Sequence, residues 1–89
     1  MAKITNKLKA IALIKLARKA NYSKKAKIPL PFLKRAFKQE YRGLIEEAYR
    51  ELYKDGYVNI LKRQREYVVI LTNKGVKKAK ELEKLLNNI

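Results

Sequence analysis

The chain has 89 residues, with 23 lysines and arginines against 8 aspartates and glutamates, and therefore a formal net charge of +15. It contains no cysteine and no histidine, which excludes a disulfide framework, thiolate metal sites, and the commonest general base and zinc ligand. Because 47% of the residues are hydrophobic, the chain can still build a core, and its length predicts a single domain over residues 1–89.

The positive charge is concentrated in the first part of the sequence. Residues 1–39 contain 12 basic and no acidic residues, whereas residues 40–89 contain 11 basic and 8 acidic ones, so the two parts carry +12 and +3. A region without acidic side chains suits a polyanion, since each lysine or arginine beside a phosphate releases condensed counterions. We therefore expect a nucleic-acid partner, the alternative being a lysine-rich surface that serves only solubility.

No apolar stretch in the sequence approaches the length of a membrane span. Runs without a charged or strongly polar residue, such as Ala10–Ile14, are far shorter than the about 20 residues needed to cross a bilayer. Lysines interrupt the start of the chain, where an apolar signal-peptide region would lie. We expect a cytoplasmic protein without membrane contact.

The first predicted helix covers about residues 5–20, with Thr5 as its cap and Asn21 as its stop, and no glycine or proline interrupts the chain between them. Its apolar residues fall on two sides, with Leu8 and Ile11 on one and Leu13 and Ala17 on another. The helix therefore needs two buried surfaces. Either it contacts both its own domain and a partner subunit, or it is the central helix of a small bundle.

A basic loop and a short second helix follow. Pro29 and Pro31 predict an extended approach over residues 22–30, and Pro31 suits the first turn of the helix. Four residues are expected to form the apolar face of this helix: Phe32, Leu33, Ala36 and Phe37. Its outer side is wholly basic.

A third helix is predicted to end at Asp55 and Gly56, a strong C-terminal stop. Residues three and four apart form its apolar face: Leu44, Ile45, Ala48, Tyr49 and Leu52. The opposite face has mixed charge and consists of Arg42, Gly43, Glu46, Glu47, Arg50, Tyr53 and Lys54.

The pattern then changes to strands. Residues 57–61 and 67–71 are β-branched and aromatic runs, which predict a hairpin. No tight-turn pair such as Asn-Gly separates them, so we expect a loop of four or five residues over 62–66. Thr72 can cap a last helix over about residues 73–88, whose apolar seam is Val76, Ala79, Leu82, Leu86 and Ile89, with Leu85 beside it.

The predicted order is helix, helix, helix, hairpin, helix, which is a mainly α protein of the α+β class. Leu52-Tyr53-Lys54-Asp55-Gly56-Tyr57-Val58 resembles the passage from recognition helix to wing strand in PadR-like and MarR-like winged helix-turn-helix proteins. Tyr67 with Leu71-Thr72-Asn73-Lys74-Gly75 resembles the passage out of the wing in the same proteins. The resemblance covers roughly residues 28–80 and implies a winged helix-turn-helix DNA-binding domain.

The length, the single C-terminal helix and the lysine content are also similar to small winged-helix proteins of archaeal plasmids and viruses, among them segregation proteins of the AspA type. That similarity implies a dimer that binds a palindromic centromere site and spreads along the DNA. It also implies an adaptor protein and a ParA-type ATPase as partners.

In a helix-turn-helix, the N-terminal half of the second helix enters the major groove. The residues expected to face base edges are Tyr41, Arg42, Gly43, Glu46, Glu47 and Arg50. Arginine can donate two hydrogen bonds to guanine, and glutamate can accept one from cytosine. The alternative is that Arg42, Glu46 and Arg50, which are four residues apart, only form ion pairs along the helix.

Two further groups of basic residues are expected on the DNA backbone. Phosphate contacts are expected from Lys24, Lys25, Lys27, Lys34, Arg35 and Lys38. The wing is expected to bring Lys62, Arg63 and Arg65 to the adjacent phosphates or minor groove, the alternative being a solvated turn.

The first and last helices are expected to form a homodimer interface through Leu8, Ile11, Leu82, Leu85, Leu86 and Ile89. The predicted function is a dimeric protein that binds double-stranded DNA, as a transcriptional regulator or as a plasmid partition protein at a centromere site. The alternative is an RNA-binding or ribosomal winged-helix protein. We expect no cofactor, metal or enzymatic activity, since the carboxylate pairs of the helices have no nucleophile or base beside them.

Overall fold

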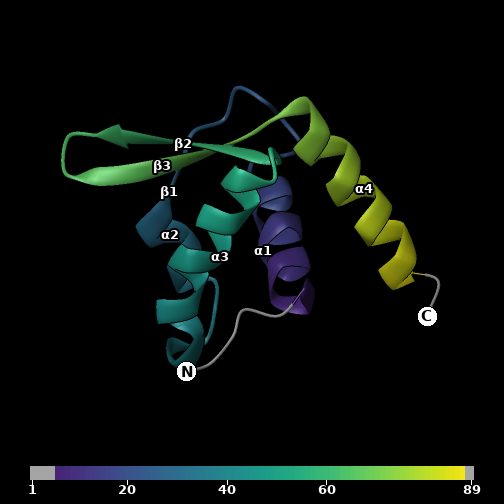
Figure 1. Cartoon of the computed structure of the whole chain (residues 1–89), viewed down its shortest axis with the longest axis horizontal. Coiled ribbons are helices and arrows are strands. Elements are labelled where there is room, and N and C mark those ends of the chain that lie inside the picture. Colours follow the sequence, from purple (N-terminus) through teal and green to yellow (C-terminus); the bar gives the residue numbers. More distant parts are fainter. Residues whose placement is uncertain (1–5, 88–89) are drawn as a thin grey trace.

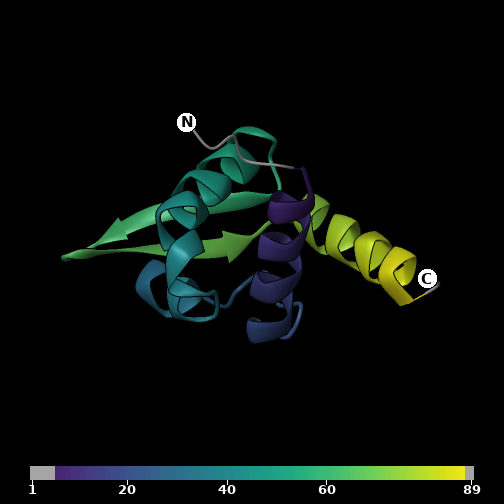
Figure 2. The same cartoon turned by 90° about the horizontal axis from the view of Figure 1, so that it is seen from below.

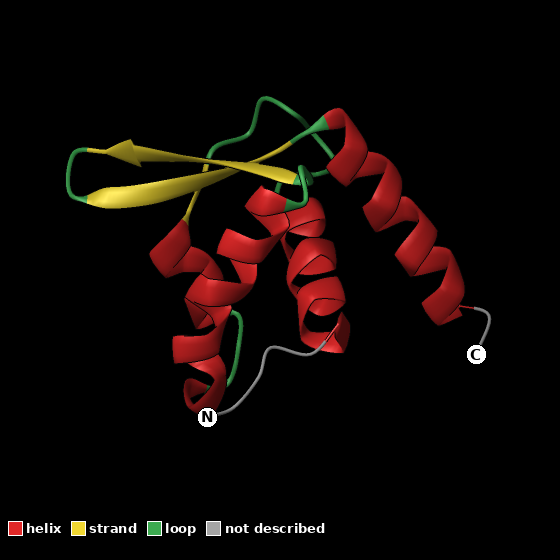
Figure 3. Cartoon of the chain, viewed as in Figure 1, coloured by secondary structure: helices red, strands yellow, loops and turns green. Residues whose placement is uncertain are grey.

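The computed structural model describes residues 6–87, with side chains up to residue 85. Four α-helices, one 3₁₀ helix and three strands follow one another as α1 (Asn6–Lys19), β1 (Ile28–Pro29), α2 (Leu30–Arg35), η1 (Gln39–Tyr41), α3 (Arg42–Lys54), β2 (Val58–Arg63), β3 (Glu66–Leu71) and α4 (Asn73–Asn87). The chain is mainly helical with a small antiparallel sheet, as expected for the α+β class (Figure 3). Within residues 6–87, no helix is long and apolar enough to cross a membrane. The suggested cap at Thr5 lies outside this range.

Helix α1 lies at the centre of the helical part, with α3 on one side and α4 on the other (Figure 1, Figure 2). Ala12, Leu16 and Ala17 have no solvent exposure, because both sides of the helix are covered. Leu8 and Ile11 are half-buried against the same core. The two-sided apolar pattern is therefore used within one chain, as expected for the central helix of a small bundle.

The end of α1 is formed by two residues with left-handed backbone conformation. Asn21 and Tyr22 have φ angles of 54° and 58°, and the Tyr22 N–H donates to the Ala17 carbonyl at 2.8 Å. Asparagine tolerates this region better than most residues, and the expected stop at Asn21 is confirmed.

The sheet has three strands in the order β1-β3-β2, whereas the sequence predicted only a hairpin. Ile28 pairs with Val69 and Pro29 with Val68, so the residues before α2 form a short edge strand. Proline is accepted there because an edge strand has one side without ladder hydrogen bonds. Two residues are too few to produce an alternating pattern, so the sequence indicates only an extended loop there.

The turn of the hairpin is shorter than expected. Lys62 pairs with Tyr67 and Arg63 with Glu66, which leaves only Gln64 and Arg65 as a two-residue turn. The expectation of four or five residues is wrong because cross-strand pairing continues beyond the apolar runs. Gln64 has a φ of 54°, which the tight turn requires. Glutamine is not a residue type that predicts this conformation.

Helix α2 begins as expected, with Pro31 in its first turn, but it ends at Arg35. Leu33 is fully buried and Phe37 nearly so, whereas Phe32 is 49% exposed. The expected common apolar face is therefore wrong for Phe32. The Lys19 ammonium lies 4.4 Å from the centroid of its ring, so a cation–π contact with α1 covers part of this phenylalanine.

Two glycines and a threonine fix the joint between α3, the hairpin and α4. Gly56 ends α3 with a φ of 83°. The Thr72 hydroxyl donates to the Gly56 carbonyl at 2.7 Å and accepts from the Gly75 N–H at 3.0 Å, so the predicted cap of the last helix is confirmed. A Cβ on Gly75 would lie 1.9 Å from the Tyr57 carbonyl oxygen, so no larger residue fits there without backbone movement.

Gly75→Ala should therefore destabilise the protein by about 1–3 kcal/mol, as overpacking against backbone does. Gly43→Ala is the matched control, since a Cβ at Gly43 meets nothing within 4 Å and alanine favours a helix by about 0.5–1 kcal/mol. Thermal unfolding followed by circular dichroism should show a lower midpoint for the first variant and an equal or higher one for the second. Equal midpoints for the two variants would contradict this account of the joint.

Candidate nucleic-acid interface

Helix α3 turns one face to the core and the other to solvent. Ile45, Ala48, Tyr49 and Leu52 form the buried face, as the sequence pattern predicted, whereas Leu44 of the predicted face is only half-buried. The Tyr49 hydroxyl donates to the carbonyl of Ala12 in α1 at 2.7 Å, and burial raises the pKa of this phenol. Because the tyrosine is fully buried and bonded to α1, it fixes how α3 is rotated about its own axis.

The residues expected to read bases lie together on the open side of this helix and in the turn before it. Tyr41 ends η1 and is 43% exposed. The four exposed residues of α3 in the set are Arg42, Gly43, Glu47 and Arg50. Gly43 lies in the first turn, where a close approach to another molecule is unobstructed by this chain.

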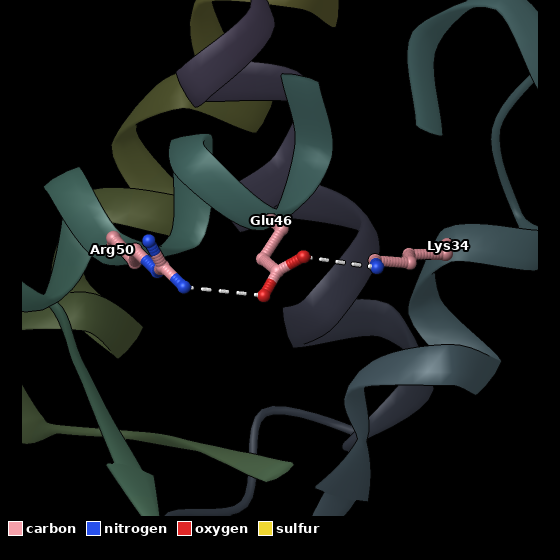
Figure 4. Close-up of polar contacts among 3 residues, drawn as sticks. All are labelled: Lys34, Glu46 and Arg50. Atoms are coloured by element: carbon pink, nitrogen blue, oxygen red, sulfur yellow. Dashed lines mark hydrogen bonds and ion pairs between the residues drawn. The ribbon is translucent and has the colours of Figure 1, made fainter. Parts of the chain in front are cut away.

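Glu46 differs from the other members of this set, because both of its carboxylate oxygens have partners in the chain. The Lys34 ammonium of α2 donates to one oxygen at 3.1 Å, and Arg50 Nη2 donates to the other at 3.3 Å (Figure 4). The ion-pair interpretation is thus confirmed for Glu46 with Arg50. Arg42, at the same four-residue spacing, has no ion pair among the described residues.

The basic residues expected on phosphates do not form one surface. Lys34, Arg35 and Lys38 belong to α2 and the turn that leads into α3. The other three, Lys24, Lys25 and Lys27, are exposed on the segment of residues 20–27. This segment passes the C-terminal end of α1 and runs on the side of the molecule away from α3 (Figure 1, Figure 2). Only the first group therefore borders the residues expected to face bases.

The hairpin of β2 and β3 extends away from the helices (Figure 1). Lys62, Arg63 and Arg65 are exposed near its tip, where the sequence placed them. The strand register puts Tyr67 opposite Lys62, and its ring lies 6.0 Å from the Lys62 ammonium. Tyr67 is 41% exposed and lines a cleft of about 90 Å³ between α3 and the hairpin, together with Glu46 and Arg50.

Tyr67 is thus a site residue that sequence reasoning missed. The sequence placed it in a strand, but its proximity to α3 depends on which face of the hairpin is turned to the helices. The alternation of β3 carries the signal, since Tyr67, Val69 and Leu71 share one face and the latter two are core residues.

The residues expected at a dimer interface differ in how far they are buried within the chain. Leu82 on α4 is half-buried against the core, as are Leu8 and Ile11 on α1. Leu85 is 62% exposed. The side chains of Leu86 and Ile89 lie outside the described residues.

Among the residues that the structure describes, three ion pairs connect the acid-free first part of the sequence to the second part. Lys9 on α1 pairs with Asp55 at 2.9 Å, Arg18 on α1 with Glu83 at 2.7 Å, and Lys34 with Glu46. Each joins two separate elements. Acidic residues that follow position 39 therefore serve as counter-charges for basic residues that precede it.

The contact at Glu83 holds α4 to the end of α1. Its carboxylate accepts hydrogen bonds from the Tyr22 hydroxyl and from Arg18 Nε. These two donors lower the pKa of Glu83, the tyrosine being the larger cause. Burial and the hydrogen bond to Glu83 raise the pKa of the Tyr22 hydroxyl. Among the residues described, no group of three or more acidic, histidine or cysteine side chains is placed to hold a metal ion.

Comparisons of the chain with protein-family models, with curated proteins and with solved structures found no match. The interpretation of this surface therefore depends on its own geometry and charge.

Glu83→Gln should lower stability at neutral pH, because it removes a carboxylate whose charged form the fold favours. The pKa of Glu83 is lower in the folded protein than in the unfolded chain. The stability that the ionised carboxylate contributes is therefore complete above the ordinary glutamate pKa of about 4.3, and it is lost as the pH falls through the lower pKa of the folded state. Urea unfolding between pH 7 and pH 2 should show the two proteins converging in the acid range.

Glu81→Gln is the control on the same helix, since Glu81 is 68% exposed and its Lys78 partner lies 3.9 Å away. It should change stability less than Glu83→Gln at pH 7. If the Glu83 variant is still less stable than the unmodified protein by the same amount at pH 2, the loss of stability comes from packing and not from charge.

Proposed function

We propose that this chain is a winged helix-turn-helix protein that binds double-stranded DNA. The observation that carries the proposal is the surface made by the exposed side of α3, the basic end of α2 and the tip of the hairpin. Arg42 and Arg50 lie on α3, and Arg35 and Lys38 flank it. In this proposal α2 and α3 are the helix-turn-helix, and β2 with β3 is the wing.

The dimensions of these elements suit duplex DNA. The major groove is about 12 Å wide and accepts an α-helix, so α3 is the element that enters it. Arg42 and Arg50 have the bidentate donor geometry that recognises guanine. The hairpin then reaches the neighbouring backbone or minor groove with Lys62, Arg63 and Arg65.

The net charge of +15 supports the same partner, because it provides long-range attraction to a polyanion. The three ion pairs between elements neutralise part of the acidic charge locally. The exposed basic residues on α2, α3 and the wing remain for DNA.

We infer that the protein acts as a dimer, either at an operator as a transcriptional regulator or at a centromere site in plasmid segregation. Leu85, exposed on a terminal helix whose C-terminal end points away from the body, supports a role of α4 in self-association (Figure 1). A symmetric dimer would bind a palindromic site. A segregation role would add spreading along DNA, an adaptor and a ParA-type ATPase, and protein-to-DNA stoichiometry on a long fragment distinguishes the two uses.

Affinity for a duplex should fall steeply with salt. If roughly 5–8 phosphates are contacted per dimer, the slope of log affinity against log salt should be about −5 to −7. Fluorescence anisotropy with a labelled 30-base-pair duplex measures this slope, and unlabelled duplex RNA and single-stranded DNA serve as competitors. Both competitors should displace the labelled duplex less effectively than unlabelled duplex DNA does. An affinity that does not change with salt, or duplex RNA that competes better than duplex DNA, would overturn the proposal.

A further inference from the structure

The carboxylate of Glu46 lies between two cations that come from different helices. Lys34 approaches it from α2 at 3.1 Å, and Arg50 approaches it from the next turn of α3 at 3.3 Å (Figure 4). The side chains of Lys34 and Glu46 are 32% and 36% exposed, whereas that of Arg50 is 65% exposed. Arg50 is therefore held at one end and open to a ligand over the rest of its guanidinium group.

We propose that Glu46 is the positioning residue of this surface: it withholds Lys34 and Arg50 from DNA phosphates and directs the guanidinium of Arg50 to a base. The inference depends on the proposed function, since it assigns the source of sequence discrimination on the same surface. It also replaces the expectation that Glu46 itself accepts a hydrogen bond from cytosine, because each of its oxygens already accepts a bond from a cation of this chain.

The geometry leaves Arg50 able to recognise a base. A guanidinium group has five N–H donors in a rigid planar fork, and the bond to Glu46 is made by Nη2. The remaining donors are sufficient for two parallel bonds to guanine. Holding one end of the fork also reduces the side-chain freedom that would be lost on binding.

The ion pairs of Glu46, and not its negative charge alone, act differently on correct and incorrect sequences. A carboxylate beside the groove repels phosphate whatever the sequence, but Glu46 also competes with phosphate for its two cationic partners. Arg50, when withheld from phosphate, gains a contact to DNA only where a suitable base is present. The ion-paired carboxylate should therefore weaken nonspecific binding more than specific binding.

Glu40 provides a matched control in η1, directly before α3, and it is not among the residues expected to face bases. It carries the same charge, it is exposed, and it has no ion pair among the described residues. Loss of its charge should strengthen binding to all duplexes alike. A difference between Glu46→Gln and Glu40→Gln therefore measures positioning and not charge alone.

The test begins with a duplex enriched from a random pool by the unmodified protein and a scrambled duplex of the same composition. Glu46→Gln should raise affinity for the scrambled duplex, and it should steepen the salt slope by about 1–2 as the two cations reach phosphates. The ratio of specific to nonspecific affinity should fall by about 5- to 100-fold, the discrimination that one bidentate base contact provides. Glu40→Gln should leave that ratio and the slope unchanged.

A double-mutant cycle with Arg50→Gln separates positioning from a general effect on the fold. In the Arg50→Gln background, Glu46→Gln should no longer change discrimination, because the group it positions is absent. The inference is overturned if the two glutamate variants behave alike, if the effect of Glu46→Gln persists without Arg50, or if no sequence is enriched from the pool. Absence of any salt-dependent duplex binding would instead overturn the proposed function itself.

Discussion

The structure depends on the burial of α1 on two sides. Alanines at positions 12 and 17 allow neighbouring elements to approach the helix closely, and Leu13 and Leu16 fill the space between them, all four being at most 1% exposed. The Tyr49 hydroxyl then joins α3 to the backbone of this helix. In the second half of α1 both apolar sides are covered. Because α3 and α4 both pack against this helix, it fixes their positions, and it also fixes which face of α3 is turned to solvent.

Charge organises what lies outside that core. The first 39 residues contain no acid, and three of their basic residues find counter-charges on Asp55, Glu83 and Glu46. Pairs that lie partly in solvent add little to stability, so they orient elements more than they stabilise the fold. Their placement separates basic residues that are already paired from those that remain open to a polyanion, and it leads to the proposed role of Glu46.

Local signals in the sequence predicted the helices, Gly56 and the Thr72 cap, because each depends on neighbours within a few residues. Features set by tertiary contacts were not predictable in the same way. The register of the hairpin decides its two-residue turn, the face that it turns to the helices brings Tyr67 toward α3, and the packing of α2 leaves Phe32 exposed. For the candidate site, spacing alone indicated the pair of Glu46 with Arg50 as an alternative to base reading. The bond from Lys34 and the separate position of residues 20–27 depend on tertiary contacts.

We propose that α3 and the hairpin form one duplex-binding surface. Amide chemical-shift mapping of the ¹⁵N-labelled protein, titrated with the enriched duplex, tests it most directly. The account predicts the largest shifts over residues 41–50 and 62–67, with small changes along α4. Shifts concentrated on α4 or on residues 20–27, with α3 unchanged, would contradict it.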